Sequence, residues 1–316
     1  MSDSTPLRFV AILGPTASGK SALGLELARK LGGERGAEII CCDSQQVYLG
    51  MDIGTAKPTR AERREIPHHL LALVHPDETF HAARWAALAR VAIRNIRLRG
   101  RVPIVVGGTG LYFRALTTGF FEAPPADAAI RARHKDEAAR LGVEALHARL
   151  AGIDAAAAAK IGPRDLVRIS RALEVYEQTG VPISALRLRA LPPEDVHAHV
   201  VVLDPPLAAL KRLVAERLDE MFKAGFEDEV RALRAAGYGP ALRPLQALGY
   251  AQVGALLDGT CTRAEALAET LSATIAYARR QRTWFRKEVA MARLPSVPVE
   301  AVAALAGALP AELRPS

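Results

Sequence analysis

Residues 14–21 read Gly14-Pro15-Thr16-Ala17-Ser18-Gly19-Lys20-Ser21, between an apolar run at residues 8–13 and a helical pattern at residues 21–31. The spacing GxxxxGK[ST] between a strand and a helix is the pattern of a phosphate-binding loop (P-loop). In such a loop, backbone N–H groups and the helix N-terminus face an anion, and the lysine adds a mobile positive charge. We therefore expect all eight residues to bind phosphate groups, with the Ser21 hydroxyl as a Mg²⁺ ligand. The pattern specifies neither the phosphate compound nor the reaction.

Short apolar runs alternate with helical patterns along most of the chain. Beyond the first strand and helix, the hydrophobic spacing predicts strands at residues 37–42, 101–106 and 199–203, and helices at residues 82–98, 207–224, 227–236 and 262–287. The alternation carries no hairpin signal and is typical of a parallel sheet with helices on its faces. We therefore expect an α/β fold, a P-loop-type parallel sheet flanked by helices.

The composition changes near residue 122. From there to about residue 189 the chain is rich in Ala, Arg and Leu at helical spacing, without a predicted strand. We therefore expect a catalytic α/β core with C-terminal helices at residues 1–121 and 197–316, interrupted by a helical insertion domain at residues 122–196. The segment after about residue 290 carries no functional signal.

The charge balance permits a polyanionic partner. Of the 316 residues, 50% are hydrophobic and 24% are charged, and the formal net charge is +8, which is compatible either with nucleic acid binding or with a solvated basic surface. No signal peptide and no apolar run of about 18 residues is present, so we expect a cytoplasmic protein without a membrane partner.

Cysteine and histidine spacing does not predict a metal site. Cys41, Cys42 and Cys261 form no CxxC or Cys/His pattern, and adjacent cysteines on a strand point to opposite faces. His68 and His69 diverge in the same way, so we do not expect them to bind one metal ion together.

Two further segments follow predicted strands at the same edge of the sheet as the P-loop. Asp43 ends the second strand, and it can serve as a Mg²⁺-organising carboxylate, as a general base or as a cap for the following turn. Ser44, Gln45 and Gln46 come next and offer hydroxyl and amide groups that can read a base edge. At residues 107–110, Gly-Gly-Thr-Gly either lets a ligand approach the backbone, with Thr109 adding a hydroxyl, or forms a tight turn.

Two arginine stripes recur at helical spacing. Arg164, Arg168 and Arg171 form the first, and Arg279, Arg282 and Arg286 form the second. Such stripes suit a phosphate backbone, although a solvated helix face has the same pattern.

Together these segments resemble the tRNA dimethylallyltransferase (tRNA isopentenyltransferase) family. The matching stretches are GPTASGKS at 14–21, DSQQVYLGMDIGTAKP at 43–58, GGTGLYFRAL at 107–116, ISRALEV at 169–175 and RRQRTWFR at 279–286. They occur in the family order across residues 8–287, and the second run is long and specific. The chain lacks the Cys/His extension of eukaryotic members, which indicates a bacterial-type enzyme.

The resemblance implies that the P-loop holds the diphosphate of dimethylallyl diphosphate, with Mg²⁺ as cofactor. The dimethylallyl group would pass to N6 of the adenosine 3′-adjacent to the anticodon, flipped out of the tRNA anticodon stem-loop into a channel through the core. Asp43 matches the family's base, Thr109 a threonine beside the reacting groups and Arg217 an arginine that binds the diphosphate. With Lys20 and Ser21, these are the expected catalytic residues. The chemistry agrees, because stabilising the departing diphosphate and removing a proton from the amine both favour transfer.

The resemblance also implies the tRNA contacts, without an obligate protein partner, so a monomer is expected. They would be Asp43, Ser44, Gln45, Gln46, Thr109, Arg131, Val167, Arg168, Ile169, Ser170, Arg171, Gln246, Ala247, Leu248, Gly249, Tyr250, Ala251, Arg279, Arg280, Gln281, Arg282, Thr283, Trp284, Phe285 and Arg286. Within these stretches, residues 247–251 lack a basic residue that is frequent in the family.

Two other classes of function are compatible with parts of the sequence. A small-molecule kinase or phosphotransferase would explain Lys20 and Ser21, but it leaves the arginine stripes and the DSQQVY segment without a role. A nucleotide-gated RNA-binding module would explain the stripes, but it has no use for Asp43 and Thr109 at the P-loop edge.

Overall fold

The computed structural model describes residues 6–119, 124–189, 195–296 and 299–315. The chain divides into two compact units, Met1–Thr117 with Glu194–Ser316, called the α/β unit below, and Thr118–Pro193, called the helical unit. The domain boundary expected between residues 121 and 122 lies outside the described residues.

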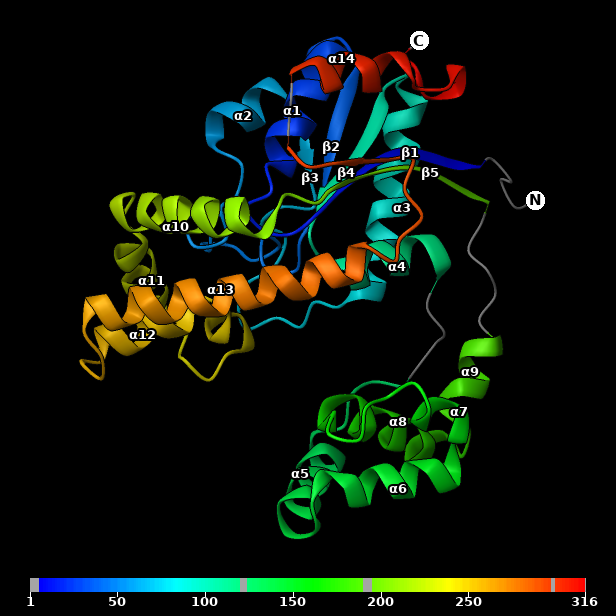
Figure 1. The fold of residues 1–316 in the computed structure, drawn as a ribbon, viewed down its shortest axis with the longest axis vertical. Coiled ribbons are helices and arrows are strands. Elements are labelled where there is room, and N and C mark those ends of the chain that lie inside the picture. The colour runs from blue at the N-terminus through cyan, green and yellow to red at the C-terminus, as the bar shows by residue number, and fades with distance from the viewer. Residues whose placement is uncertain (1–5, 120–123, 190–194, 297–298, 316) are drawn as a thin grey trace. The chain divides into compact units, whose positions relative to one another are not determined.

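The α/β unit is built on a six-stranded sheet (Figure 1). Its order is β3-β2-β4-β1-β5-β6, and every neighbouring pair is parallel. The strands are β1 (Leu7–Leu13), β2 (Ala37–Cys42), β3 (His68–His69), β4 (Val102–Gly107), β5 (Val196–Leu203) and β6 (Ala292–Leu294). The predicted α/β fold class with a parallel sheet is confirmed.

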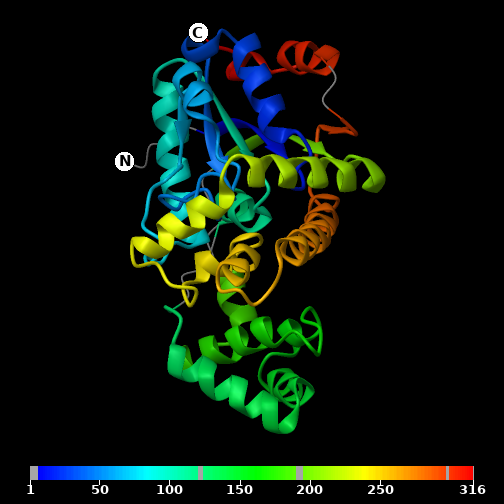
Figure 2. The same ribbon diagram turned by 90° about the vertical axis from the view of Figure 1, so that its left-hand side faces the viewer.

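Both faces of the central strands are buried, as their continuous apolar runs predict. On one face, Phe9 and Ile40 pack against α3 (Ala82–Leu98) and α4 (Gly110–Thr118). On the other, Ile12 and Ile39 pack against α1 (Lys20–Lys30) and α14 (Val299–Gly307) (Figure 2). Cys42 belongs to the first cluster and Cys41 to the second, and burial raises the pKa of both thiols, so neither is poised as a nucleophile.

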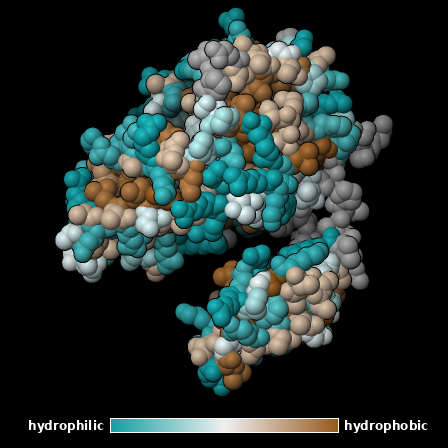
Figure 3. Space-filling model, in the orientation of Figure 1, coloured by the Kyte–Doolittle hydropathy of each residue, from teal (hydrophilic) through white to brown (hydrophobic). Residues whose placement is uncertain are grey.

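Four helices cover the carboxyl ends of the strands, where the P-loop lies. They are α10 (Leu207–Lys223), α11 (Phe226–Ala235), α12 (Tyr250–Leu257) and α13 (Arg263–Phe285). Phe222, Phe226, Tyr250 and Phe285 anchor them to the core. On a mostly hydrophilic surface of this unit, apolar residues gather between α10 and α13 (Figure 3). A short helix, α2 (Arg60–Glu65), and 3₁₀ turns at Gly33–Arg35, Arg243–Gln246 and Ala311–Leu313 complete the unit.

The helical unit consists of α5 (Ala128–Leu141), α6 (Val143–Ile153), α7 (Ala155–Ala158), α8 (Leu166–Thr179) and α9 (Ile183–Arg189). Its core contains Leu146, Leu150, Ile169 and Leu173. The described residues of this unit form no strand, in line with the spacing of their apolar residues.

The strands β3 and β6 and the helices α2, α4, α12 and α14 were not predicted from the sequence. β3 and β6 have two and three residues, too few for a periodic signal, and they exist because β2 and β5 offer open edges. The segment after residue 290, to which no role was assigned, supplies β6 and α14, and Leu305 and Leu309 cover α1.

Across the described residues, no helix combines the length and apolar character needed to cross a membrane.

Candidate active site

The loop between β1 and α1 has backbone angles typical of an anion-binding loop. Ala17 and Gly19 have left-handed φ angles of 59° and 87°, which curl the loop so that its N–H groups converge. No side chain caps α1 at Gly19, and the first turn of α1 has no acidic residue. Its orphan N–H groups and the helix dipole therefore favour negative charge. A Cβ on Gly14 would lie 2.7 Å from the Leu203 carbonyl oxygen, so β1 can approach β5 here only through glycine.

Two cations lie beside this loop. Lys20 donates from Nζ to the Pro15 carbonyl oxygen at 3.2 Å, and Arg217 on α10 has Nη1 3.5 Å from the Thr16 hydroxyl oxygen. Burial, and next the charge of Arg217, lower the pKa of Lys20 to about 8, and burial lowers the pKa of Arg217. Among the described residues neither cation forms an ion pair, so a bound anion would relieve their repulsion and desolvation.

Asp43 lies at the end of β2 and caps the turn that follows. Its Oδ1 accepts from the backbone N–H groups of Gln45 at 2.8 Å and Gln46 at 3.4 Å. In the described structure the second carboxylate oxygen takes no part in these bonds, and Asp43 lines the cavity that contains Lys20. The turn-capping and the catalytic interpretations are therefore compatible, because each uses a different oxygen.

Thr109 holds the same turn from the neighbouring strand. Its hydroxyl oxygen accepts from the Ser44 N–H at 3.0 Å, and its own N–H donates to the Cys42 carbonyl oxygen at 3.2 Å. Thr109 is not among the residues that line the cavity. It therefore contacts the cavity wall through Ser44, which lines the cavity.

The glycines after β4 make room for α13 and β2. A Cβ on Gly108 would lie 2.5 Å from Gln281 Nε2, and one on Gly110 would lie 2.1 Å from Trp284 Nε1. A Cβ on Gly107 would lie 2.0 Å from the Cys42 carbonyl oxygen. At Gly108 and Gly110 protein atoms therefore occupy the space that a side chain would take, as in a tight turn, whereas Gly107 lines the cavity.

Gln281 joins the P-loop to the loop after β4. Its Oε1 accepts from the Thr16 N–H and its Nε2 donates to the Gly108 carbonyl oxygen, both at 2.8 Å. The side chain is buried and lines the cavity. Its carboxamide therefore sets the spacing of two sheet-edge loops, a role distinct from the RNA contact implied for this stretch.

A cavity of about 400 Å³ brings most of the expected reaction site together. Of the expected residues, it is lined by Thr16, Ala17, Lys20, Ser21, Asp43, Ser44, Gln45, Gln46, Arg217, Gln246, Ala247, Leu248, Gly249, Tyr250, Arg280 and Gln281. A second cavity, of about 270 Å³, shares Ala17, Lys20, Ser21, Gln46 and Arg217 with the first. Lys20 and Arg217 therefore contribute to both cavities.

The protein offers a metal ion few ligands of its own here. Ser21 is exposed and lines both cavities. No cluster of three or more His, Cys, Asp or Glu side chains suited to a metal occurs in the described parts of the chain. This donor set fits a cation held mainly by substrate phosphates and water, as Mg²⁺ commonly is.

Most arginines of the two stripes bind acidic side chains within the protein. Arg282 and Arg286 both bind Asp204, at 2.5 Å and 3.1 Å, and the Arg282 side chain is 14% exposed. Burial raises the pKa of Asp204, but the hydrogen bonds from these two arginines lower it overall. Arg279 and Arg280 are exposed and form no ion pair with the described residues, which leaves their charge available to a ligand.

The helical unit pairs its arginines in the same way. Arg131 and Arg171 bind the buried Glu174 at 3.0 Å and 2.7 Å, and Arg168 binds Asp165 at 2.6 Å. The remaining stripe member, Arg164, binds Glu144 at 3.1 Å. These pairs reduce the charge that the stripe presents to an RNA backbone.

Several side chains expected at the RNA surface are buried instead. Ile169 belongs to the helical unit's core, the Ser170 hydroxyl forms a hydrogen bond with the His134 ring, and Phe285 is 1% exposed. The resemblance implies contacts over whole stretches, whereas the helical repeat turns these side chains inward. Val167 is 81% exposed.

A stripe of cavity residues on α13 was not among the expected site residues. Thr270, Thr274 and Tyr277 line the cavity together with Gln281. They follow one another at i, i+4, i+7 and i+11, so a polar helix face opposite the arginine stripe was the signal that could have found them. The apolar lining residues Val214, Leu218, Met221 and Phe226 carried no signal apart from core packing.

A family model described as IPP transferase matches residues 46–288 of the chain. Among curated proteins, a tRNA dimethylallyltransferase of Anaeromyxobacter sp. (strain K) is 51% identical over 300 residues, covering 94% of this chain and 96% of the relative. A tRNA dimethylallyltransferase of Myxococcus xanthus (strain DK1622) is 46% identical over 300 residues, covering 95% and 96%.

Solved structures are also similar to this chain. The full-length tRNA isopentenylpyrophosphate transferase from Bacillus halodurans has a TM-score of 0.68 at 34% identity, with 97% of each chain covered. A eukaryotic dimethylallyltransferase described as acting on tRNA has a TM-score of 0.71 at 26% identity, covering 88% of this chain and 69% of that one.

Proposed function

The chain belongs to the tRNA dimethylallyltransferase (IPP transferase) family, and from this membership we propose that it transfers a dimethylallyl group from dimethylallyl diphosphate to tRNA. The acceptor is N6 of the adenosine 3′-adjacent to the anticodon, and diphosphate is released. One observation carries the proposal: Lys20 and Arg217, neither of them in an ion pair within the described structure, share a cavity with Asp43.

The diphosphate end of the donor binds at the P-loop. Lys20, Arg217 and the N–H groups at the start of α1 stabilise the charge that the departing diphosphate acquires. Ser21 would hold Mg²⁺ beside the phosphates, and the ion, when bound, would neutralise part of the same charge. The five-carbon chain lies against Val214, Leu218 and other apolar residues of the cavity, which keep water from the allylic carbon.

The amine attacks from the side of Asp43. The bond between the allylic carbon and the diphosphate oxygen breaks, and a bond between that carbon and N6 forms. One N6 proton passes to the Asp43 carboxylate, whose Oδ1 holds the turn while the other oxygen remains available. Thr109 acts through Ser44, whose N–H it fixes.

The tRNA contacts of the α/β unit follow exposure and cavity lining. Ser44, Gln45 and residues 246–250 line the cavity and can read the flipped base. Arg279 and Arg280, which form no ion pair with the described residues, supply positive charge for the phosphate backbone. In the helical unit, Val167 and Arg168 present exposed side chains to the RNA.

The experiment incubates the full chain with dimethylallyl diphosphate labelled in the prenyl group and with unmodified tRNA, in parallel with ATP labelled at the γ-phosphate. We expect prenyl label in the tRNA and no phosphate transfer. Asp43→Ala should lower kcat by about 10²–10⁴ with little change in tRNA affinity, whereas the exposed Asp77→Asn should match the parent. Phosphate transfer from ATP, or full turnover by the Asp43 variant, would overturn the proposal.

A further inference from the structure

Residues 51–57 form a loop that is folded around a buried lysine. The Lys57 side chain is 1% exposed, and its Nζ donates to Asp52 Oδ1 at 2.7 Å and to the Tyr48 carbonyl oxygen. Its backbone N–H donates to the Asp52 carbonyl oxygen at 3.0 Å. A buried ammonium is retained only where it is paired and hydrogen-bonded, so these contacts give the loop one shape.

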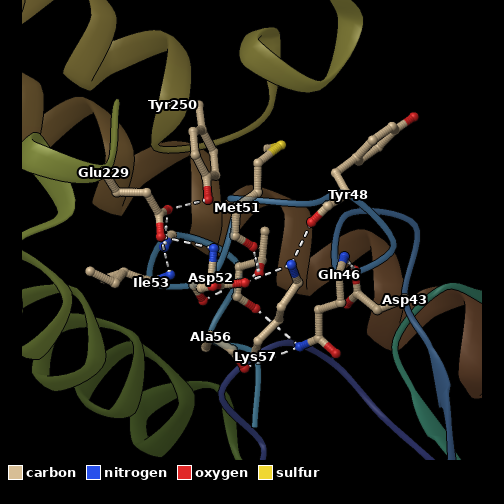
Figure 4. A network of polar contacts seen from close by, with 12 residues as sticks. Asp43, Gln46, Tyr48, Met51, Asp52, Ile53, Ala56, Lys57, Glu229 and Tyr250 are labelled. Atoms are coloured by element: carbon tan, nitrogen blue, oxygen red, sulfur yellow. Dashed lines mark hydrogen bonds and ion pairs between the residues drawn. The ribbon is translucent and has the colours of Figure 1, made fainter. Parts of the chain in front are cut away.

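Glu229 on α11 binds this loop through successive backbone N–H groups (Figure 4). Its Oε2 accepts from the N–H groups of Asp52 at 2.8 Å and Ile53 at 2.6 Å, and its Oε1 accepts from that of Gly54 at 3.1 Å. The Tyr250 hydroxyl donates to Oε1 at 2.6 Å. Four donors converge on one carboxylate, and bonds of this kind to an ionised acceptor are about twice as strong as neutral ones.

The same loop accepts hydrogen bonds from the side chain of Gln46. Gln46 Nε2 donates to the carbonyl oxygens of Thr55 and Ala56, both at 3.1 Å. The backbone N–H of Gln46 in turn faces Asp43 Oδ1 at 3.4 Å, beside the shorter bond from Gln45. Hydrogen bonds therefore join Glu229 to the backbone of residues 52–54, the adjoining residues 55 and 56 to Gln46, and Gln46 to Asp43.

The loop also forms part of the cavity wall. Gly54 and Thr55 line the same cavity as Asp43, whereas Glu229 is not among the residues that line it. A Cβ on Gly54 would lie 2.2 Å from Phe226 Cε2, so the loop is packed closely against α11. A shift of the loop would therefore change both the wall of the cavity and the support of the Asp43 turn.

We propose that Glu229 is a positioning residue for the transfer reaction. It places the Asp43 carboxylate from α11 through the loop and Gln46, without contact with either substrate. This inference rests on the proposed function, because it assigns Glu229 a part in that reaction. A carboxylate is required since glutamine replaces one acceptor oxygen with a donor, and aspartate is one methylene too short to reach from the same helix.

The test compares Glu229→Ala and Glu229→Gln with Glu227→Gln as a matched control. Glu227 lies on the same helix, and among the described residues it binds the Arg231 and Arg263 side chains alone, at 3.3 Å and 2.9 Å. Steady-state kinetics give kcat and KM for both substrates at a temperature where all variants are folded. We expect kcat to fall about 10–100-fold for Glu229→Ala and less for Glu229→Gln, with both KM values nearly unchanged, because a displacement of about 1 Å costs up to about 10²-fold.

Hydrogen exchange measures the same link without any substrate. If Glu229 holds the turn after Asp43 in place through the loop, Glu229→Ala should speed hydrogen exchange at the N–H groups of residues 52–54 and also at those of Gln45 and Gln46. Faster exchange confined to residues 52–54, or an unchanged kcat, would overturn the inference. If the parent transfers no prenyl group, the proposed function fails, and the exchange result still decides whether Glu229 supports the Asp43 turn.

A double variant tests whether the two ends act together. Gln46→Leu breaks the link in the middle while leaving the carboxylate and its donors in place. Because both changes interrupt one chain, the loss in kcat for Glu229→Gln with Gln46→Leu should not exceed that of the worse single variant by more than about twofold. Losses that multiply would show independent roles and overturn the inference.

Discussion

Replacing Gln281 with leucine should lower the free energy of unfolding of the α/β unit, because it removes two hydrogen bonds between loops of that unit. Leucine keeps much of the volume but removes the acceptor for the Thr16 N–H and the donor for the Gly108 carbonyl oxygen, both now at 2.8 Å. Gly108 is buried, so leaving its carbonyl oxygen without a partner should lower the free energy of unfolding by about 1–3 kcal/mol. The Thr16 N–H faces the cavity, so losing its acceptor should lower it by about 0.5–1.5 kcal/mol. The expected loss in the free energy of unfolding is thus about 1.5–4.5 kcal/mol.

Urea unfolding followed by tryptophan fluorescence measures this loss. Both tryptophans, Trp85 and Trp284, lie in the α/β unit, so the signal reports on that unit alone. Gln246→Leu is the control, because Gln246 is exposed, lies in the same unit, and its amide donates to the Pro240 and Ala241 carbonyl oxygens over longer distances of 3.5 Å and 3.3 Å. A Gln281→Leu variant within 0.5 kcal/mol of the parent would refute the assignment of Gln281 as the link between the two loops.

Gln281→Glu separates the positional role from the electrostatic one. Glutamate still accepts from the Thr16 N–H, but its second oxygen faces the Gly108 carbonyl oxygen and its charge lies in the cavity that contains Lys20. Binding of dimethylallyl diphosphate, measured by calorimetry, should therefore weaken more for Gln281→Glu than for Gln281→Leu. Equal affinities in the two variants would contradict an anion site beside Gln281.

Three further predictions follow from named contacts. Because the pKa of Lys20 is about 8, its ammonium is charged below pH 8, and the affinity of the free enzyme for diphosphate should fall as the pH rises through that value. An affinity that calorimetry finds independent of pH would contradict this. Gly54→Ala should destabilise the fold by about 1–3 kcal/mol in urea, because its Cβ would lie 2.2 Å from Phe226 Cε2, and an unchanged midpoint would argue against that packing. Arg279→Ala should reduce the slope of log affinity for tRNA against log salt concentration by about 0.7–0.9 and leave the melting temperature unchanged, and an unchanged slope would show that this side chain is solvated surface. Arg282→Ala should instead lower the melting temperature, because it removes the 2.5 Å ion pair with Asp204.

The sequence predicted the features that depend on local backbone chemistry. The P-loop spacing places Lys20 at the start of α1, and continuous apolar runs predict β1, β2 and β4 as buried parallel strands. The position of Asp43 after β2 was also readable, because the carboxyl ends of parallel strands meet at one edge. Each of these signals is contained in a few consecutive residues.

Only the tertiary structure decided which partners these residues meet. Arg282 and Arg286 form an arginine stripe in the sequence, yet they bind Asp204, more than 70 residues earlier in the chain. Gln281 reaches back 265 residues to the P-loop, and Glu229 reaches back 177 residues to the loop that supports Asp43. Helical periodicity states which face a side chain occupies, but the element that packs against that face is set by the burial of the whole core. The sequence alone therefore determined the chemistry available at the sheet edge, and the packing of α11 and α13 determined which side chains hold it in place.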